Sequence, residues 1–281
     1  MKKTVLSLGL LTTLMFAQSN GNGFNLENYS ESTLTAELKN AIAYMGNEER
    51  LAYDIYQNLY NYHLDENGIA INQLQNISEK SEIKHIGIVK DLVNRYELSA
   101  DELSDVSNPI ADRYIDVYDM PSGEYDIPLI QELYNMLYSK GINSQRDALE
   151  AGCMVEVTDI NDLNYDIRMA EDSQAEDVVA AFNVLRDGSY NHYWAFDKGL
   201  KSLGVEEGCC SLGTISHVDY CQPNYPNKDQ GNGVESENTT LSSNIESDNS
   251  AGNKNGKNDK NNNMNSNGKG NSSNGNGRGK N

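Results

Sequence analysis

The sequence predicts an all-α protein: an antiparallel bundle of four long helices with one long crossover, followed by a disordered C-terminal tail. Between Leu34 and Leu203 the apolar residues recur mostly with a helical period, and no alternating apolar and polar run is long enough to compete. Clusters of Gly, Pro, Asn and Asp divide this stretch into segments. The 281 residues, 37% of them hydrophobic, suffice for one sizeable core.

The first two long helices form one predicted hairpin. The first covers about residues 33–62, with Met45 and Tyr56 on one face, and the chain turns at 65–68, a polar cluster that closes with glycine. The second covers about 71–96. Helices joined by so short a turn pack antiparallel.

The other helices follow a crossover. Residues 97–127 contain prolines and a Pro-Ser-Gly turn, so we expect a loop there and then a short helix at 128–140. A third long helix covers about 144–165, because Ser144 with an acid three residues on resembles a capping box, and a fourth covers about 175–203. A single long crossover between the second and third long helices is the connectivity of a ferritin-like bundle.

The N-terminus has the pattern of a secretory signal. Two lysines precede an apolar run that ends near Phe16 and is too short to span a bilayer. We therefore interpret 1–17 as a signal peptide and 18–32 as a linker, with a buried N-terminal helix as the alternative. The mature protein is expected to be exported to the periplasm, cell surface or medium, without membrane insertion.

The C-terminal residues form a tail of different composition. Residues 222–281 are dominated by Asn, Gly, Ser and Lys and have almost nothing to bury, so we expect disorder, as a spacer or as an adhesive arm. The tail is nearly neutral, whereas the whole chain carries a charge of −20, so the acidic character belongs to the predicted bundle domain, 33–221. Such acidity argues against nucleic-acid partners.

Four cysteines permit disulfides in an exported protein. Cys153 lies within an apolar stripe and is expected to be a buried thiol. The expected bridge joins Cys221 to Cys209 or Cys210. Since no Cys-x-x-Cys pair occurs, a zinc ribbon or a thioredoxin-type motif is excluded.

Ionisable residues interrupt the apolar stripes of all four long helices. They are Glu49 on the first, Glu82 and His85 on the second, Glu156 on the third and His192 on the fourth. Carboxylates in a core are costly unless they are paired, and a shared cation removes that cost. We therefore expect a metal site formed by these five side chains.

The spacing of these residues supports their convergence. Glu49 and His85 are 36 residues apart, and so are Glu156 and His192. The midpoint of each pair falls in a predicted break between helices. Because residues equidistant from the turn of an antiparallel hairpin lie at the same height, each Glu should meet its His.

These segments also resemble a known family. Glu49–Tyr56 has the Glu-x-x-Ala-x-x-x-Tyr pattern of rubrerythrin-like helices. Together with Ile77–His85, Glu156–Leu163 and Gly188–Phe196, it resembles a bacterial ferritin-like family catalogued as domain of unknown function 2202, over about residues 35–205. The resemblance implies a ferritin-like fold and a carboxylate-bridged metal pair, without an established reaction.

One position departs from the full di-iron pattern. That pattern has a second Glu-x-x-His, and the repeat places its Glu at Ser189. Asp159, one turn from Glu156, is a candidate substitute with a shorter reach. Without it the second metal ion would be weakly held or absent, so one or two ions are expected.

Oxygen and nitrogen ligands suit iron, with manganese as the alternative. We therefore expect an exported metalloprotein with oxidase, peroxidase or ferroxidase chemistry; whether it is an enzyme stays open, as does oligomerisation. The alternative is a non-catalytic metal-binding or adhesive module that uses the bundle as a scaffold. Tyr53 and Tyr56, near Glu49, are interpreted as ordinary packing rather than redox groups. His63 and His217 are expected in loops.

Overall fold

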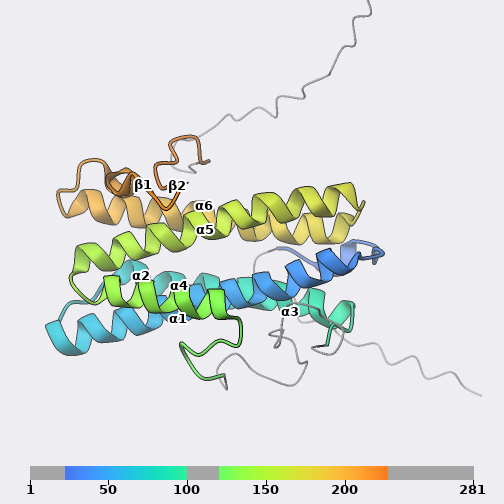
Figure 1. The fold of residues 1–281 in the computed structure, drawn as a ribbon, viewed down its shortest axis with the longest axis horizontal. Helices are drawn as coiled ribbons and strands as arrows, with labels where there is room; N and C mark the ends of the chain where they lie inside the picture. The colour runs from blue at the N-terminus through green and yellow to red at the C-terminus, as the bar shows by residue number, and fades with distance from the viewer. Residues whose placement is uncertain (1–22, 100–119, 227–281) are drawn as a thin grey trace, which may run out of the picture. The chain divides into compact units, whose positions relative to one another are not determined.

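The structure, a computed structural model, describes residues 23–99 and 120–226 and is mostly helical (Figure 1). Its helical elements are η1 (Leu26–Asn28), α1 (Ala36–Asn67), α2 (Asn72–Ile77), the π-helical turn η2 (Ser78–Glu82), α3 (Ile83–Arg95), α4 (Pro128–Gly141), α5 (Gln145–Asp172), α6 (Glu176–Ser202) and η5 (Gly208–Leu212). A small antiparallel hairpin joins β1 (Thr214–Ile215) to β2 (Val218–Asp219). The predicted all-α class is confirmed. The expected signal peptide lies outside the described residues, as does all but the start of the expected tail.

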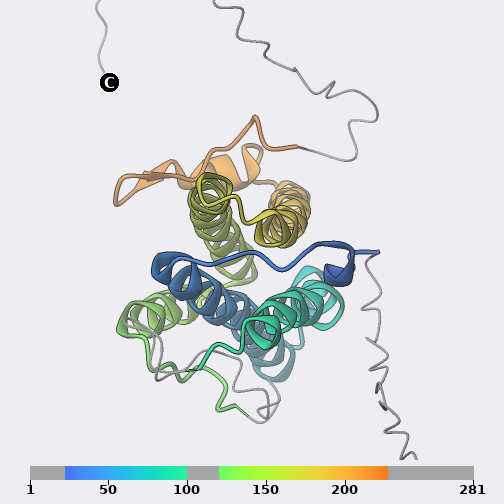
Figure 2. The same ribbon diagram turned by 90° about the vertical axis from the view of Figure 1, so that its right-hand side faces the viewer.

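The long helices are arranged as two antiparallel pairs. Helix α1 turns back into α2, η2 and α3, and α5 turns back into α6 (Figures 1 and 2). Helix α1 also packs against α5, and α3 against α6, while α4 lies against α1 and α5. Elements far apart in the sequence therefore surround one shared interior.

Side-chain caps set the starts of α1 and α5 close to their predicted positions. Thr35 accepts a hydrogen bond from the Leu38 N–H and starts α1, which continues to Gly68, a left-handed residue at φ 66°. His63 is therefore in α1, not in a loop, and its Nε2 lies 2.8 Å from the carbonyl oxygen of Gly141. Ser144 caps α5 as predicted, but that helix extends to Asp172.

The second predicted helix is not regular. At η2 it widens into a π-helical turn between α2 and α3. The Ser78 hydroxyl lies 2.8 Å from the Leu74 carbonyl oxygen, and the Gln57 amide donates to that hydroxyl over 3.0 Å. A π turn accommodates one additional residue and often occurs at functional sites. It ends at Glu82, one of the predicted ligands.

The core of the described residues consists of two large apolar clusters and a small third one, Ile86 with Met120. The first includes Tyr56, Leu74, Cys153 and Phe196, and the second includes residues such as Phe182. On α1, α5, α6 and the α2–α3 helix, the buried side chains change from one cluster to the other at a few polar positions. These polar positions form a layer between the clusters, which we call the polar layer.

The C-terminal end of the crossover is fixed to α1. The Arg50 guanidinium donates to the carbonyl oxygens of Pro121 and Glu124, over 2.5 and 2.9 Å, and lies 4.5 Å from the centre of the Tyr125 ring. The Asp54 carboxylate accepts from the Tyr125 hydroxyl over 2.6 Å. Both α1 side chains are buried, so these contacts hold the segment before α4 against the helix.

All four cysteines form disulfides. Cys210 pairs with Cys221, one of the two pairings expected, but Cys153 pairs with Cys209 and is not a free thiol. The segment that follows α6 folds back onto α5, where Cys209 becomes fully buried against the helix. Sequence alone could not place this segment beside Cys153, 56 residues away.

We expect the buried disulfide to contribute more stability than the outer one. Its sequence separation is 56 residues against 11 for the Cys210–Cys221 bridge. Loop-closure entropy gives about 4 and about 3 kcal/mol respectively. Urea denaturation of Cys153→Ala/Cys209→Ala and Cys210→Ala/Cys221→Ala should therefore show the larger loss for the first pair. A larger loss for the Cys210–Cys221 variant would mean that the contact between α5 and the segment after α6 contributes little to stability.

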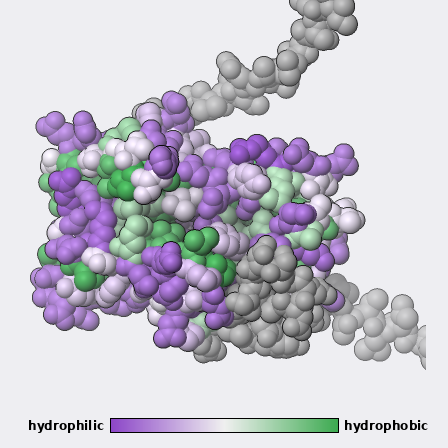
Figure 3. Space-filling model, in the orientation of Figure 1, coloured by the Kyte–Doolittle hydropathy of each residue, from purple (hydrophilic) through white to green (hydrophobic). Residues whose placement is uncertain are grey.

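Hydrophilic residues cover most of the face drawn in Figure 3, with hydrophobic patches near its centre. Within 23–99 and 120–226, none of the helices combines the length and apolar composition needed to cross a bilayer.

Candidate metal centre

The five predicted ligands converge in the polar layer. Glu49 comes from α1, Glu82 from the end of η2, His85 from α3, Glu156 from α5 and His192 from α6. All are buried, and the most exposed of them, His192, retains only 6% exposure. Four segments of the chain therefore supply one buried set of carboxylates and imidazoles.

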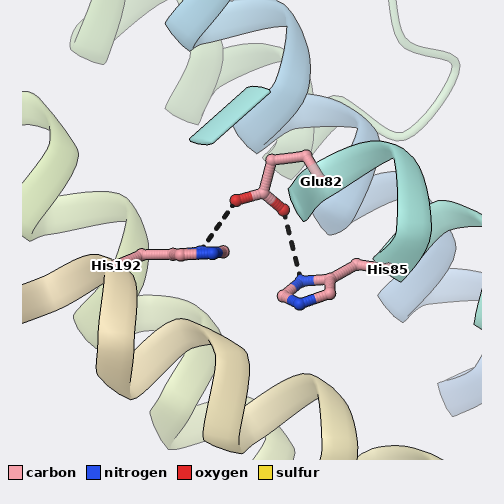
Figure 4. A group of neighbouring side chains, drawn as sticks. All are labelled: Glu82, His85 and His192. Atoms are coloured by element: carbon pink, nitrogen blue, oxygen red, sulfur yellow. Dashed lines mark ion pairs between the residues drawn. The ribbon is translucent and has the colours of Figure 1, made fainter. Parts of the chain in front are cut away.

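Glu82 lies between the two histidines (Figure 4). One of its carboxylate oxygens is 3.3 Å from His85 Nδ1 and the other is 3.0 Å from His192 Nδ1. The two imidazole rings stack with their centres 5.2 Å apart. Ligand atoms of these three residues all lie within 4.8 Å of one another, close enough to surround an ion.

The spacing predicted two Glu–His pairs, and both are in contact. His85 Nδ1 is 3.0 Å from Glu49 Oε2, and His192 Nδ1 is 3.4 Å from Glu156 Oε1. The equal offset therefore corresponds to two similar Glu–His pairs, and both histidines also contact Glu82.

Several atoms of the polar layer are buried without a hydrogen-bond partner. They are Glu49 Oε1, Glu82 Oε1, Asp159 Oδ1 and His192 Nδ1. Leaving buried polar atoms unpaired costs about 1–3 kcal/mol each, and more for charged groups. Glu82 Oε1 and His192 Nδ1 face each other at 3.0 Å without hydrogen-bond geometry. Carboxylate oxygens and imidazole nitrogens are donors that divalent transition metals bind.

The electrostatics show strong competition for protons. Burial raises the pKa of Glu49 to about 7, although His85 opposes the rise. Burial alone would lower the pKa of His192, but Glu156 and Glu82 raise it to about 10. Burial also raises the pKa of Asp159, with Glu49 and Glu156 adding to the effect. Without a cation this layer retains protons, so metal binding would release them.

Asp159 lies beside the position of the absent glutamate. The Ser189 hydroxyl donates a short hydrogen bond to Asp159 Oδ2, which leaves Oδ1 unpaired. The negative charges of Glu49, Glu156 and Glu82 all act on this carboxylate. A carboxylate from α5, held by Ser189 on α6, therefore occupies the part of the layer where the repeat predicts a glutamate.

Neighbouring side chains orient the predicted ligands. The Tyr56 hydroxyl donates to Glu156 Oε1 over 2.5 Å, and Ser81 Oγ is 2.7 Å from His192 Nε2. With Nε2 bonded to Ser81, Nδ1 of His192 is directed at the carboxylates. Tyr56 was expected only to pack, and Tyr53 does pack, against Ile86 and Met120. Ser81 was missed, because a serine before Glu82 has no distinguishing sequence pattern.

A pocket of about 450 Å³ reaches the histidines between the η2 turn and α6. Its lining includes Ser81, His85, Gly188 and His192. A Cβ atom added at Gly188 would lie 2.2 Å from His85 Nε2, so this glycine makes room for the ring. Solvent thus reaches the outer edges of the imidazoles, while the carboxylates stay enclosed.

We expect Gly188→Ala to displace His85 and to weaken metal binding by roughly 10–100-fold, the effect typical of disturbed ligand orientation. Gly152→Ala is the matched control, because its added Cβ would lie 2.5 Å from the Phe196 ring and not at a histidine. Metal titration of both variants tests this: equal affinities in the two would show that the His85 ring can move without loss.

The part of the chain that matches known proteins includes all the predicted ligands. The family described as "Uncharacterized protein domain (DUF2202)" matches residues 38–219. The uncharacterized protein MJ0754 of Methanocaldococcus jannaschii is 32% identical over 171 residues, 61% of this chain and 79% of that protein. The crystal structure of hypothetical protein MJ0754 from Methanococcus jannaschii matches with a TM-score of 0.52 and 29% identity, over 72% of this chain and 93% of that one. None of these names specifies a reaction.

Proposed function

The chain belongs to the DUF2202 family, and from its polar layer we propose that it is an exported, ferritin-like metalloprotein whose four-helix bundle holds a carboxylate- and histidine-bound metal pair. One observation carries the proposal: Glu82 lies between His85 and His192, at 3.3 and 3.0 Å, among buried oxygens that lack partners. Two antiparallel helix pairs with one long crossover are the connectivity of ferritin-like bundles.

The ligands divide into two half-sites. Glu49 and His85 would hold one ion, Glu156 and His192 would hold the other, and Glu82 with Asp159 would be shared. This donor set of oxygen and imidazole nitrogen favours iron, with manganese as the alternative. An iron pair in such a site supplies oxidation of ferrous ions or reduction of oxygen or peroxide.

The surrounding residues prepare the site for that chemistry. The two apolar clusters exclude water above and below the layer. Tyr56 and Ser81 hold Glu156 and His192 in place. Glu156 and Glu82 raise the pKa of His192, so this imidazole stays protonated until metal binds and displaces the proton.

The proposal of export is supported by the two disulfides, which persist in oxidising compartments and are rare in the cytosol of mesophiles. It also rests on the signal pattern of residues 1–17, which lie outside the described part of the chain.

Anaerobic reconstitution with ferrous iron, followed by exposure to air, tests the function. We expect about two iron ions per chain and an oxygen-dependent rise in near-ultraviolet absorption. His85→Ala/His192→Ala should abolish both. His63→Ala is the matched control, since this buried histidine contacts Gly141 and not the layer. Binding of calcium alone, unaffected by the histidine variants, would favour the non-catalytic scaffold instead.

A further inference from the structure

Buried acids continue beyond the metal centre, along the seam between α1 and α5. They are Glu48 on α1 and Asp159, Asp162 and Asp166 on α5, where spacings of three and four residues place them on one helix face. Glu48 and Asp166 retain 5% and 7% exposure, and Asp162 is half-buried. Because both histidines come from α3 and α6, this seam lies on the side of the centre away from them.

These acids have no basic partner among the residues that the structure describes. None of them forms an ion pair, in contrast to Glu150 on the same helix, which contacts Lys140 and Arg146. The carboxyl groups of Glu48 and Asp162 instead share a hydrogen bond. Uncompensated buried charge is strongly unfavourable, so these acids either keep a proton, as their raised pKa values indicate, or take up a cation.

Two buried oxygens in the seam point to that cation. Glu48 Oε2 and Asp159 Oδ1 are both inaccessible and have no hydrogen-bond partner. Glu48 is adjacent in sequence to Glu49 but interacts electrostatically with Asp159, Asp162 and Asp166, which places its carboxylate in the seam. One oxygen of this deeply buried carboxylate, Glu48 Oε2, therefore lacks a partner and lies among further carboxylates.

The acids form a row from a partly exposed residue towards the centre. Asp162 is its most accessible member, Glu48 contacts Asp162, and Asp159 interacts with both Glu48 and Glu49. Negative charge lining a low-dielectric passage concentrates cations and raises their rate of arrival.

We propose that Glu48, Asp162 and Asp166 form a second cation site, in the α1–α5 seam, from which divalent metal ions pass by way of Asp159 to the metal centre. Only oxygen atoms are offered here, so hard, partly hydrated divalent cations fit best. In the described residues it is Glu82, His85 and His192 whose ligand atoms converge within 4.8 Å, so the seam is the looser site. Loose binding suits passage rather than storage. This inference rests on the proposed function.

The rate of metal loading tests the proposal. Cobalt(II) is mixed with metal-free protein, and its visible absorption reports arrival at the histidines. Asp162→Asn/Asp166→Asn should load at least about tenfold more slowly than wild type and reach the same final spectrum and stoichiometry. The matched control is Glu171→Gln/Asp172→Asn, which removes two acids from the end of the same helix and should load within about twofold of wild type.

A wild-type loading rate in the seam variant would overturn the proposal, because the acids would then hold only protons. Loss of cobalt from the finished centre would overturn it too, since the acids would be ligands of that centre. The asparagine variants remove repulsion without changing shape, so they should fold.

A second measurement separates this proposal from the proposed function. If wild type shows no histidine-bound cobalt, the function fails. The seam is then examined by manganese(II) titration with electron paramagnetic resonance in His85→Ala/His192→Ala. Weak binding that disappears on adding Asp162→Asn/Asp166→Asn supports the seam site, and unchanged binding overturns it.

Discussion

Removal of the metal with a chelator is expected to lower the melting temperature by about 10 °C or more. A ligand at a thousandfold excess over its Kd stabilises the folded state by about 4 kcal/mol, and two ions would contribute about twice that. For a domain of this size each kcal/mol corresponds to about 2–4 °C. Scanning calorimetry with and without chelator at pH 8 measures the change.

The melting temperature should fall because chelation leaves negatively charged side chains in the core without a cation. Chelation leaves Glu49, Glu82, Glu156 and Asp159 together in one buried layer with two imidazoles. Protons relieve part of the repulsion, because the pKa of His192, near two carboxylates, is raised to about 10. Holding a proton on Asp159, whose pKa burial raises, costs folding free energy at pH 8, which lies above the ordinary pKa of an aspartate.

His85→Ala/His192→Ala provides the control, because a protein that binds no metal should melt at the same temperature with and without chelator. The shift in wild type should also be restored by added metal in a concentration-dependent way. An unchanged melting temperature in wild type would mean that the layer is satisfied by protons alone.

The helix pairs and the convergence of the five predicted side chains could be derived from the sequence because both depend on helical geometry. Glu49 and His85, like Glu156 and His192, share one offset about a short turn, and the side chains meet as that offset requires. Regular spacing converts directly into height along a helix. The same reasoning gave Asp159 only as a candidate substitute for the absent glutamate, since spacing does not show how far a side chain extends.

The remaining features depend on contacts that no local pattern encodes. The π turn at η2 has no compositional signature, so Ser81 could not be paired with His192 in advance. Cys153 forms a disulfide with Cys209 only because the chain after α6 folds back onto α5. Glu48 looks like one more acid in an acidic chain until its burial is known.

The Asp159 carboxylate lies beside Ser189, where the repeat predicts a glutamate. Asp159→Ala should raise the Kd of the second metal ion by about 100-fold, because a shared ligand is lost while Glu82 remains. Adding Ser189→Glu should restore two-ion binding, since position 189 precedes His192 as Glu82 precedes His85, and its hydroxyl already contacts Asp159. The double variant moves one carboxylate from α5 to α6 without raising the charge of the layer, whereas Ser189→Glu alone would crowd a further acid against Asp159.

Metal analysis and titration of wild type and the three variants measure the outcome. Two tight ions in Asp159→Ala would show that Asp159 is no ligand. A folded double variant that still binds one ion would show that position 189 does not face the metals, and the two half-sites would then differ at this point.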